Sequence, residues 1–199
     1  QLSLYKMQLS QVMSLMTLGP ANELGIDVGP LITAAAKDKV SAYLIAQATN
    51  IVYQCNVPKG LLKLGHYVAP TLLELHELES FNEEVFGPIL HIMGYDECAP
   101  ESLIDAINQK KYGLTFGVHS RMPSRIALFS NTVNCGNIYI NRDIIGASVG
   151  LQPFGGRNLS GTGPKAGGPN YLRAFVNEKT VSENTVAFGG DPDLLNENS

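Results

Sequence analysis

The first candidate for chemistry in this sequence is a glycine-rich segment, residues 146–169. It holds eight of the twenty glycines in the chain. Each glycine inside a helix or strand costs roughly 0.5–1 kcal/mol relative to alanine, so this density predicts a long loop, and such loops are usually functional or disordered. Leu151, Phe154 and Leu159 lie within it, and a solvated glycine–serine tether would lack such side chains. Composition alone leaves two alternatives open, a binding loop and a structural crossover.

One part of this segment could be mistaken for a phosphate-binding loop. Residues 161–165 read Gly-Thr-Gly-Pro-Lys. A phosphate loop needs the order Gly-x-x-x-x-Gly-Lys-Ser/Thr, and Pro164 has no backbone N–H to donate to a phosphate. We therefore interpret residues 161–169 as a crossover, with Arg157 and Lys165 as charges that keep the loop solvated.

The cysteines and histidines show no spacing typical of a metal site or a disulfide framework. They are dispersed along the chain: Cys55, Cys98, Cys135, His66, His76, His91 and His119. A sparse, odd number of cysteines favours a reducing compartment, so we expect a cytoplasmic protein. We predict no metal site.

Composition limits the class of protein further. The chain has 199 residues, of which 44% are hydrophobic, which is enough for a sizeable core. The net charge is −4 and the basic residues are scattered, so nucleic acid is not an expected partner. No apolar run approaches the ~20 residues of a membrane span, and we expect no secretory leader. The chain starts at Gln1 inside a helical pattern, so we expect a fragment of a longer protein.

The hydrophobic pattern predicts helices that alternate with strands. We expect helices over residues 2–17, 33–48, 80–87, 99–109 and 123–129, and strands over 51–53, 67–73, 88–93, 114–118 and 135–141. Thr33 is expected to cap the second helix, and Ser80 with Glu83 to form a capping box that opens the third. This alternation predicts an α/β fold with a mainly parallel sheet. Residues 175–188 are predicted to add one or two strands.

Three motifs, in this order, resemble the aldehyde dehydrogenases. Residues 84–88, Glu-Val-Phe-Gly-Pro, resemble a Glu-x-Phe-Gly-Pro motif of that family, and residues 137–142, Asn-Ile-Tyr-Ile-Asn-Arg, resemble a late strand. Residues 152–156, Gln-Pro-Phe-Gly-Gly, with the glycines that follow, resemble the closing loop of the subfamily that acts on glutamate semialdehyde. The similarity runs from about residue 7 to residue 171. The tail, residues 181–190, resembles the C-terminus of the bacterial bifunctional proline utilization A family.

The resemblance implies a domain organisation and a reaction. Residues 1–172 would be an N-terminally truncated portion of the aldehyde dehydrogenase catalytic domain, and residues 173–199 an oligomerisation strand and tail. In this family a Cys thiolate attacks the aldehyde, hydride passes to NAD+, and the resulting thioester is hydrolysed. None of the three cysteines here lies in the family's nucleophile motif. The resemblance therefore places the catalytic Cys upstream of Gln1 and implies that this chain alone is inactive.

The same resemblance assigns the cofactor-binding residues. Glu84 matches the carboxylate that accepts hydrogen bonds from the nicotinamide ribose of NAD, and Phe86 matches an aromatic residue that packs near the nicotinamide. The alternatives are a surface carboxylate in the first turn of a helix and a plain core aromatic.

The expected substrate site lies in the glycine-rich segment. Glutamate semialdehyde carries a carboxylate remote from its aldehyde, and N–H groups in a tight glycine turn can converge on a carboxylate. Gly146, Ala147 and Ser148 match the place where the subfamily anchors that group, and Phe154 would form an apolar wall. Ser148 departs from the hydrophobic residue expected in the bacterial branch.

Two readings of the whole chain remain. The first is part of an NAD-dependent L-glutamate γ-semialdehyde dehydrogenase of proline catabolism, whose partners are the substrate, the remainder of the enzyme and further copies in a homo-oligomer. The second is a catalytically empty oligomerisation or interaction module, or a fragment of another aldehyde dehydrogenase subfamily.

Overall fold

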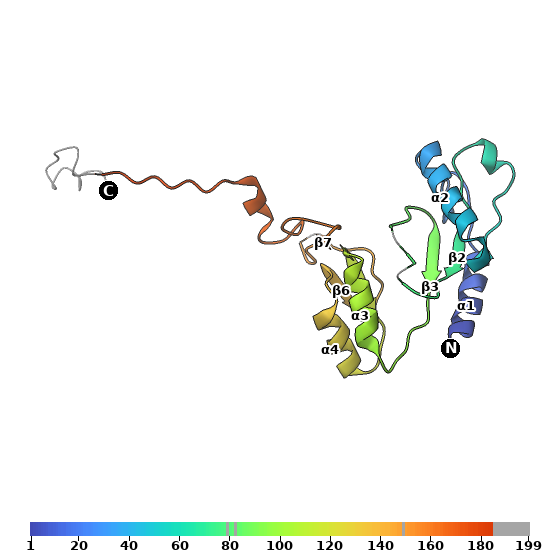
Figure 1. Cartoon of the computed structure of the whole chain (residues 1–199). Helices are drawn as coiled ribbons and strands as arrows, with labels where there is room; N and C mark the ends of the chain where they lie inside the picture. The colour runs from blue at the N-terminus through green and yellow to red at the C-terminus, as the bar shows by residue number, and fades with distance from the viewer. Residues whose placement is uncertain (79, 82, 149, 185–199) are drawn as a thin grey trace. The chain divides into compact units, whose positions relative to one another are not determined.

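The computed structural model describes residues 1–78, 80–81, 83–148 and 150–184 (Figure 1). The chain forms two compact units. Unit 1 consists of Gln1–Lys111 with Asn131–Val133, and unit 2 of Tyr112–Ser130 with Asn134–Ser199. Each unit combines helices with strands, so the predicted α/β class is confirmed.

Unit 1 is built on a three-stranded sheet in the order β1-β2-β3. The strands are β1 (Ile51–Gln54), β2 (Thr71–Glu74) and β3 (Ile89–Ile92). β1 pairs with β2 antiparallel, and β2 pairs with β3 parallel. Helices α1 (Leu2–Ser14) and α2 (Ala34–Ala46) precede the sheet in the chain, and α3 (Pro100–Gln109) follows it. The predicted strand over residues 67–73 begins only at Thr71.

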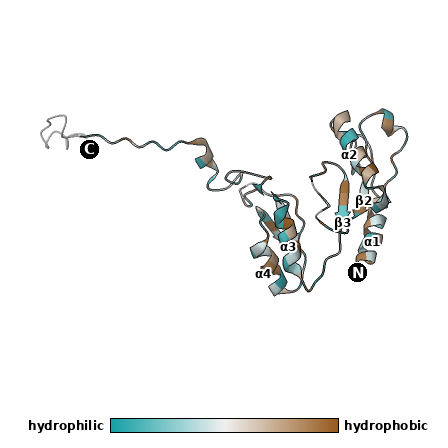
Figure 2. Ribbon diagram, viewed as in Figure 1, coloured by the Kyte–Doolittle hydropathy of each residue, from teal (hydrophilic) through white to brown (hydrophobic). Residues whose placement is uncertain are grey.

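The central strand, β2, is buried on both faces. Leu72 and Leu73 are both 0% exposed, and neighbouring strand residues point to opposite faces of a sheet. Leu72 belongs to a core cluster with Met13 of α1, and Leu73 to a second cluster with Val40 of α2. Figure 2 shows apolar residues on the sheet strands and on both of these helices. Because β2 needs apolar cover on each face, the buried apolar residues of α1 and α2 position the sheet.

The predicted cap of α2 is confirmed, whereas the predicted capping box is wrong. The Thr33 side chain accepts a hydrogen bond from the Ala36 backbone N–H at 3.1 Å. Ser80 Oγ, by contrast, donates to the Glu77 carbonyl at 2.8 Å, and the described residues from 80 to 88 form no helix. A helix that must end before Pro88 is too short to offset the cost of nucleation, so the segment is a loop.

Unit 2 centres on a parallel strand pair with a helix between its strands. Strands β5 (Thr115–Val118) and β6 (Asn137–Ile140) pair in parallel, and α4 (Pro123–Thr132) connects them. Phe129 of α4 is buried, and its ring centroid lies 6.1 Å from that of Phe116 on β5. The short strands β4 (Tyr112–Gly113) and β7 (Arg157–Asn158) pair antiparallel. β7 lies inside the segment that the sequence predicted only as a loop.

Parallel pairing predominates, as predicted. The two parallel ladders join four residue pairs each, whereas the antiparallel ladders join three and two.

The predicted strand in the tail is not formed over its described part. A 3-10 turn, Tyr171–Phe175, is followed by residues 176–184 without regular secondary structure. The rest of the predicted tail lies outside the described residues. A strand exists only where a second strand pairs with its N–H and C=O groups, and no strand in the described part of the chain forms a ladder with residues 176–184.

Candidate functional site

Glu84 and Phe86 lie in unit 1, on the loop between β2 and β3. Both side chains are exposed, Phe86 at 79%, whereas Val85 and Gly87 are half-buried. Val85 packs against the core cluster that contains Val40. Alternating burial is typical of an extended segment whose successive side chains point to opposite sides. The loop therefore presents Glu84 and Phe86 together on its outer side.

The backbone beside Phe86 is fixed to α2 and β2. A Cβ on Gly87 would lie 2.9 Å from Cγ2 of Val40, so the backbone approaches α2 as closely as a glycine permits. The Pro88 carbonyl accepts a hydrogen bond from the Thr71 N–H at 3.0 Å. The backbone next to Glu84 and Phe86 is thus held in place by contacts with the core.

The Glu84–Phe86 pair has the chemistry that a nicotinamide nucleotide requires. A carboxylate offers two acceptor oxygens to a pair of ribose hydroxyls, and an exposed ring offers an apolar face. The residues therefore fit the cofactor that the resemblance implies. The alternatives are weaker, because Phe86 is not a core residue and Glu84 does not lie in a helix.

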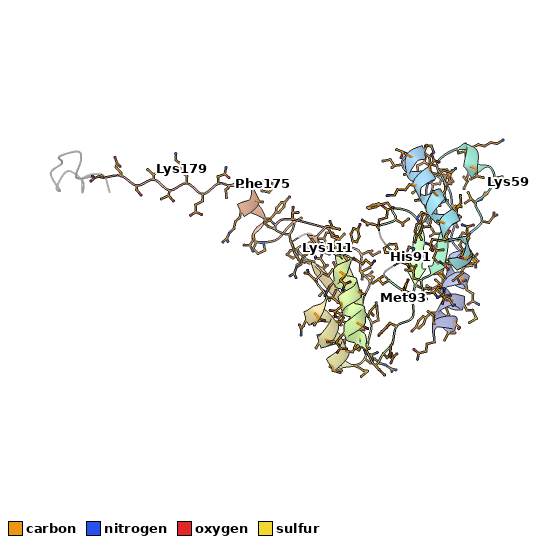
Figure 3. All side chains as sticks on the ribbon, in the orientation of Figure 1. Lys59, His91, Met93, Lys111, Phe175 and Lys179 are labelled. Atoms are coloured by element: carbon orange, nitrogen blue, oxygen red, sulfur yellow. The ribbon has the colours of Figure 1, made fainter. Side chains whose placement is uncertain are left out.

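A cluster of three rings, which the sequence analysis missed, includes Phe81 of the same loop. Tyr43 Oη on α2 lies 2.8 Å from His91 Nε2 on β3, and the Phe81 ring centroid lies 4.8 Å from that of His91. His91 is labelled in Figure 3. Burial lowers the pKa of His91 below its usual value and raises the pKa of Tyr43. The Tyr43 hydroxyl and the imidazole share this hydrogen bond, and the tautomer of the ring sets which group donates.

The proposed anchor for the substrate carboxylate lies in unit 2, after β6. Gly146 has a φ of +76°, a left-handed conformation that favours glycine, and nothing lies within 4 Å of where a Cβ would stand. Gly146 and Ser148 are exposed and Ala147 is half-buried. No hydrogen bond among the described residues engages the N–H of Gly146 or Ala147. The Ser148 N–H faces Gln152 Oε1 at 3.4 Å, so two donors of this turn remain available for an anion.

Phe154 is half-buried and pairs with Ala166, near the end of the glycine-rich segment. Its N–H donates to the Ala166 carbonyl at 3.0 Å, and its carbonyl accepts from the Ala166 N–H at 2.9 Å. Towards the anchor, the Ser148 carbonyl accepts a hydrogen bond from the Gln152 N–H at 2.9 Å. Gln152, two residues before Phe154 in the chain, is therefore the residue that is hydrogen-bonded to the anchor turn.

Lys165 was interpreted as a solvating charge, and that interpretation is wrong. The residue is half-buried, and its Nζ donates to the Gly136 carbonyl and, at 3.2 Å, to Asn137 Oδ1. Asn137 is 7% exposed, and its Nδ2 donates to the carbonyls of Leu114, at 2.8 Å, and Gly155, at 3.0 Å. We call Lys165, Gly136, Asn137 and Gly155 the lysine clamp.

A shallow groove of about 360 Å³ lies along β6 beside the clamp. It contains two cationic side chains, Arg142 and Lys165, and both are engaged. Arg142 pairs with Asp143 at 3.1 Å and lies 5.1 Å above the centre of the Tyr139 ring. Since its cations already have partners, the groove is not assigned to an anion.

The described residues contain neither a metal-binding cluster nor a membrane-spanning helix. No group of three or more His, Cys, Asp or Glu side chains there could hold a metal ion. None of the helices in that part of the chain is long and apolar enough to cross a membrane.

Comparison with known families and sequences identifies relatives of this chain. The family model described as the aldehyde dehydrogenase family matches residues 4–181. The chain is 44% identical over 172 residues to the bifunctional protein PutA of Rhizobium meliloti, which covers 85% of this chain and 14% of the relative. It is 35% identical over 174 residues to 1-pyrroline-5-carboxylate dehydrogenase of Bacillus cytotoxicus, covering 84% of this chain and 32% of that protein.

Solved structures show the same similarity. A crystal structure of a Bradyrhizobium japonicum proline utilization A (PutA) mutant superposes with a TM-score of 0.84 at 41% identity, covering 93% of this chain and 19% of that one. A 1-pyrroline-5-carboxylate dehydrogenase from Thermus with bound NAD superposes with a TM-score of 0.71 at 34% identity, covering 83% and 32%. The chain therefore spans only a minor part of the length of each of these relatives.

The contact between Gly136 and Gly155 predicts a sharp stability difference between two alanine substitutions. A Cβ at Gly136 would overlap the Gly155 carbonyl oxygen, whereas a Cβ at Gly163 would have nothing within 4 Å. Gly136→Ala should lower the free energy of unfolding by about 1–3 kcal/mol, as overpacking does. Gly163→Ala should change it by less than about 0.5 kcal/mol. Urea denaturation of both variants measures the difference, and equal midpoints would show that the two backbones do not touch.

Burial of His91 predicts a pH dependence of stability. Its pKa in the folded chain lies below the usual 6.5, so the unfolded chain binds more protons as the pH falls below about 6.5. Stability should therefore be highest above that pH and decline beneath it, by a fraction of the ~1.4 kcal/mol per pKa unit because the ring is only half-buried. Denaturation at pH 7.5 and pH 5.5 should show a smaller loss in His91→Gln than in the parent chain. His76→Gln, at an exposed position, is the matched control and should keep the full loss.

Proposed function

Because this chain belongs to the aldehyde dehydrogenase family, we propose that it is part of an NAD-dependent enzyme that oxidises L-glutamate γ-semialdehyde to L-glutamate in proline catabolism. The observation that carries the proposal is the turn at residues 146–148, where a left-handed glycine leaves two N–H groups available. A substrate with a carboxylate remote from its aldehyde matches such a turn. The relatives named PutA and 1-pyrroline-5-carboxylate dehydrogenase support this choice of substrate.

The substrate is held at its two ends by different chemistry. The N–H groups of Gly146 and Ala147 donate to the carboxylate, and Ser148 adds a polar side chain beside them. Phe154 provides an apolar wall for the methylene groups between the carboxylate and the aldehyde. Holding the carboxylate fixes how far the aldehyde can reach, so the turn orients the reacting end as well as binding the substrate.

The cofactor is NAD, held by Glu84 and Phe86. Glu84 accepts hydrogen bonds from the ribose hydroxyls, and Phe86 packs near the nicotinamide. When bound, NAD+ supplies the acceptor for the hydride that leaves the aldehyde carbon. The relative from Thermus that was solved with NAD bound supports this assignment.

The nucleophile is assigned to the longer protein rather than to this chain. A catalytic Cys needs a lowered pKa and access to the substrate. Cys55 and Cys135 are buried, and burial raises the pKa of Cys55, which is opposite to what a nucleophile requires. Cys98 is exposed but lies in the loop before α3, in unit 1. All three cysteines are free, which supports a reducing compartment such as the cytoplasm.

A second function, assembly into an oligomer, is favoured by the exposed apolar side chains of the tail. They are Leu172, Phe175, Val176 and Val181, each more than two-thirds exposed. Exposed apolar side chains close together in the chain are typical of a surface that packs against a partner. We assign this role to the tail in addition to catalysis by the longer enzyme.

Replacing Glu84 tests the cofactor assignment. The suitable enzyme is a chimera in which residues 4–181 of this chain replace the matched segment of the Rhizobium meliloti PutA. In this chimera, Glu84→Gln should raise KM for NAD+ about tenfold or more, since hydrogen bonds to charged groups contribute about 1.5–3 kcal/mol. Glu83→Gln is the matched control, because Glu83 is an exposed neighbour that pairs with Lys39. Equal effects of the two substitutions on KM for NAD+ would refute the role of Glu84.

Replacing Gly146 tests the carboxylate anchor. Gly146→Val forces a β-branched residue into a φ of +76°, which costs about 1–3 kcal/mol or shifts the turn. In the chimera, KM for glutamate semialdehyde should rise at least about fivefold, while KM for propanal, which has no carboxylate, stays unchanged. Gly150→Val is the control, since Gly150 has a φ of +81° in the same loop and no assigned role. A parallel loss of activity on both aldehydes would contradict the anchor.

A further inference from the structure

We propose that Lys165 is a positioning residue for the substrate pocket, which acts by holding Gly155 and, with it, Phe154 against β6. The proposal rests on the proposed function for the role of Phe154, whereas the clamp itself is a matter of geometry in unit 2. The Lys165 ammonium group is partly removed from water in the folded chain. Lysine is seldom buried unless its charge is satisfied, so such a placement indicates a specific task.

The partners of Lys165 define that task. Its Nζ donates to the Gly136 carbonyl and, at 3.2 Å, to Asn137 Oδ1, and both oxygen atoms belong to β6 or to the residue before it. The Lys165 side chain therefore spans from the glycine-rich segment to the strand. The two contacts are 28 and 29 residues apart in sequence, so they close a long loop onto the sheet.

Lys165 also determines which way the Asn137 amide faces. An ammonium group only donates hydrogen bonds, so the atom of Asn137 that faces it must be the oxygen. The amide nitrogen then points the other way, where it donates to the carbonyls of Leu114, at 2.8 Å, and Gly155, at 3.0 Å. With Lys165 replaced by an apolar side chain, Oδ1 would lose its donor at a position that is 7% exposed.

The clamp acts on both sides of the Phe154 pairing. Gly155 follows Phe154, and Lys165 precedes Ala166, with which Phe154 exchanges two backbone hydrogen bonds of 3.0 and 2.9 Å. Gly155 also lies against Lys165 itself, since a Cβ on Gly155 would be 3.3 Å from the Lys165 Cα. The lysine clamp thus holds both segments of the Phe154–Ala166 pairing, one at Gly155 and the other at Lys165.

Rigid attachment of Phe154 matters for substrate affinity more than for the chemical step. Phe154 contacts the methylene part of the proposed substrate. This contact stabilises the bound substrate and the transition state equally. Loss of uniform binding of this kind raises KM and leaves kcat unchanged. A residue that was needed only for folding would instead lower the amount of active enzyme, and with it the apparent kcat.

The first arm of the test uses the 199-residue chain and does not depend on the function. Lys165→Met, which keeps the length of the side chain and removes its donors, should raise the hydrogen-exchange rates of the Phe154 and Ala166 amides about tenfold or more. Amides of unit 1 should be unaffected. Lys179→Met, on the exposed tail beyond Phe175 (Figure 3), is the matched control and should change neither. Unchanged exchange at Phe154 and Ala166 in Lys165→Met would overturn the clamp.

The second arm uses the chimera and tests the consequence for catalysis. Lys165→Met should raise KM for glutamate semialdehyde about tenfold while kcat and KM for NAD+ stay within about twofold. Lys165→Arg, which keeps donors for the two oxygen atoms, should recover at least part of the change. A drop in kcat at constant KM would overturn the positioning role even where exchange has confirmed the clamp. A chimera that is inactive on the semialdehyde before any substitution would count against the proposed function, and the exchange arm would still decide the clamp.

Discussion

The side-chain amide of Asn137 is the interaction on which the glycine-rich segment depends. It is buried in the parallel pair of unit 2, and it receives one hydrogen bond from Lys165 and donates two, to Leu114 and Gly155. A buried amide is costly unless its donors and acceptor are all satisfied, and here they are. Through this amide, the loop at Gly155 is hydrogen-bonded to β6 and approaches the backbone of Gly136 closely. Gly136 is needed for that approach, since a Cβ there would overlap the Gly155 carbonyl oxygen, and Gly155 in turn lies close against Lys165.

In unit 1, the loop that carries Glu84 and Phe86 is held by apolar packing instead of a polar network. Burial of Leu72 and Leu73 on opposite faces of β2 fixes α1 and α2 against the sheet, and α2 in turn holds Gly87. The loop with Glu84 and Phe86 then needs no hydrogen-bonded scaffold of its own. In both units, the residues assigned to binding stand on loops, and the residues that hold these loops are buried in the neighbouring helices and strands. This division is expected where precise placement and access to solvent are both required.

Local patterns in the sequence predicted most of the fold. Thr33 before an alanine run identified the start of α2, and apolar runs identified five of the strands, because these signals act between residues close in the chain. The capping box at Ser80 was wrong because Pro88, a few residues on, leaves no room for a helix. The roles of Lys165 and Asn137 were missed for a different reason, since their contact joins residues 28 apart and nothing in the local pattern marks it. The Tyr43–His91 contact, across 48 residues, escaped detection in the same way. Glu84, Phe86, Gly146, Ala147, Ser148 and Phe154 were found only through motifs, and their roles remain proposals.

The exposure of Phe86 bears on whether the β2–β3 loop binds a ligand or only connects two strands. A phenylalanine placed in the core contributes about 1.5–3 kcal/mol of burial energy, and Phe86, at 79% exposed, forgoes most of it. The neighbouring Val85 and Gly87 show that the core was within reach, because both pack inward from adjacent positions. A shift of the loop by one residue would bury Phe86 and expose Val85, yet Gly87 against Val40 prevents that shift. The fold thus holds an apolar ring outward at a measurable cost in stability, next to a carboxylate on the same side. The proposed nicotinamide nucleotide, which has an apolar ring and a pair of ribose hydroxyls, would account for that arrangement.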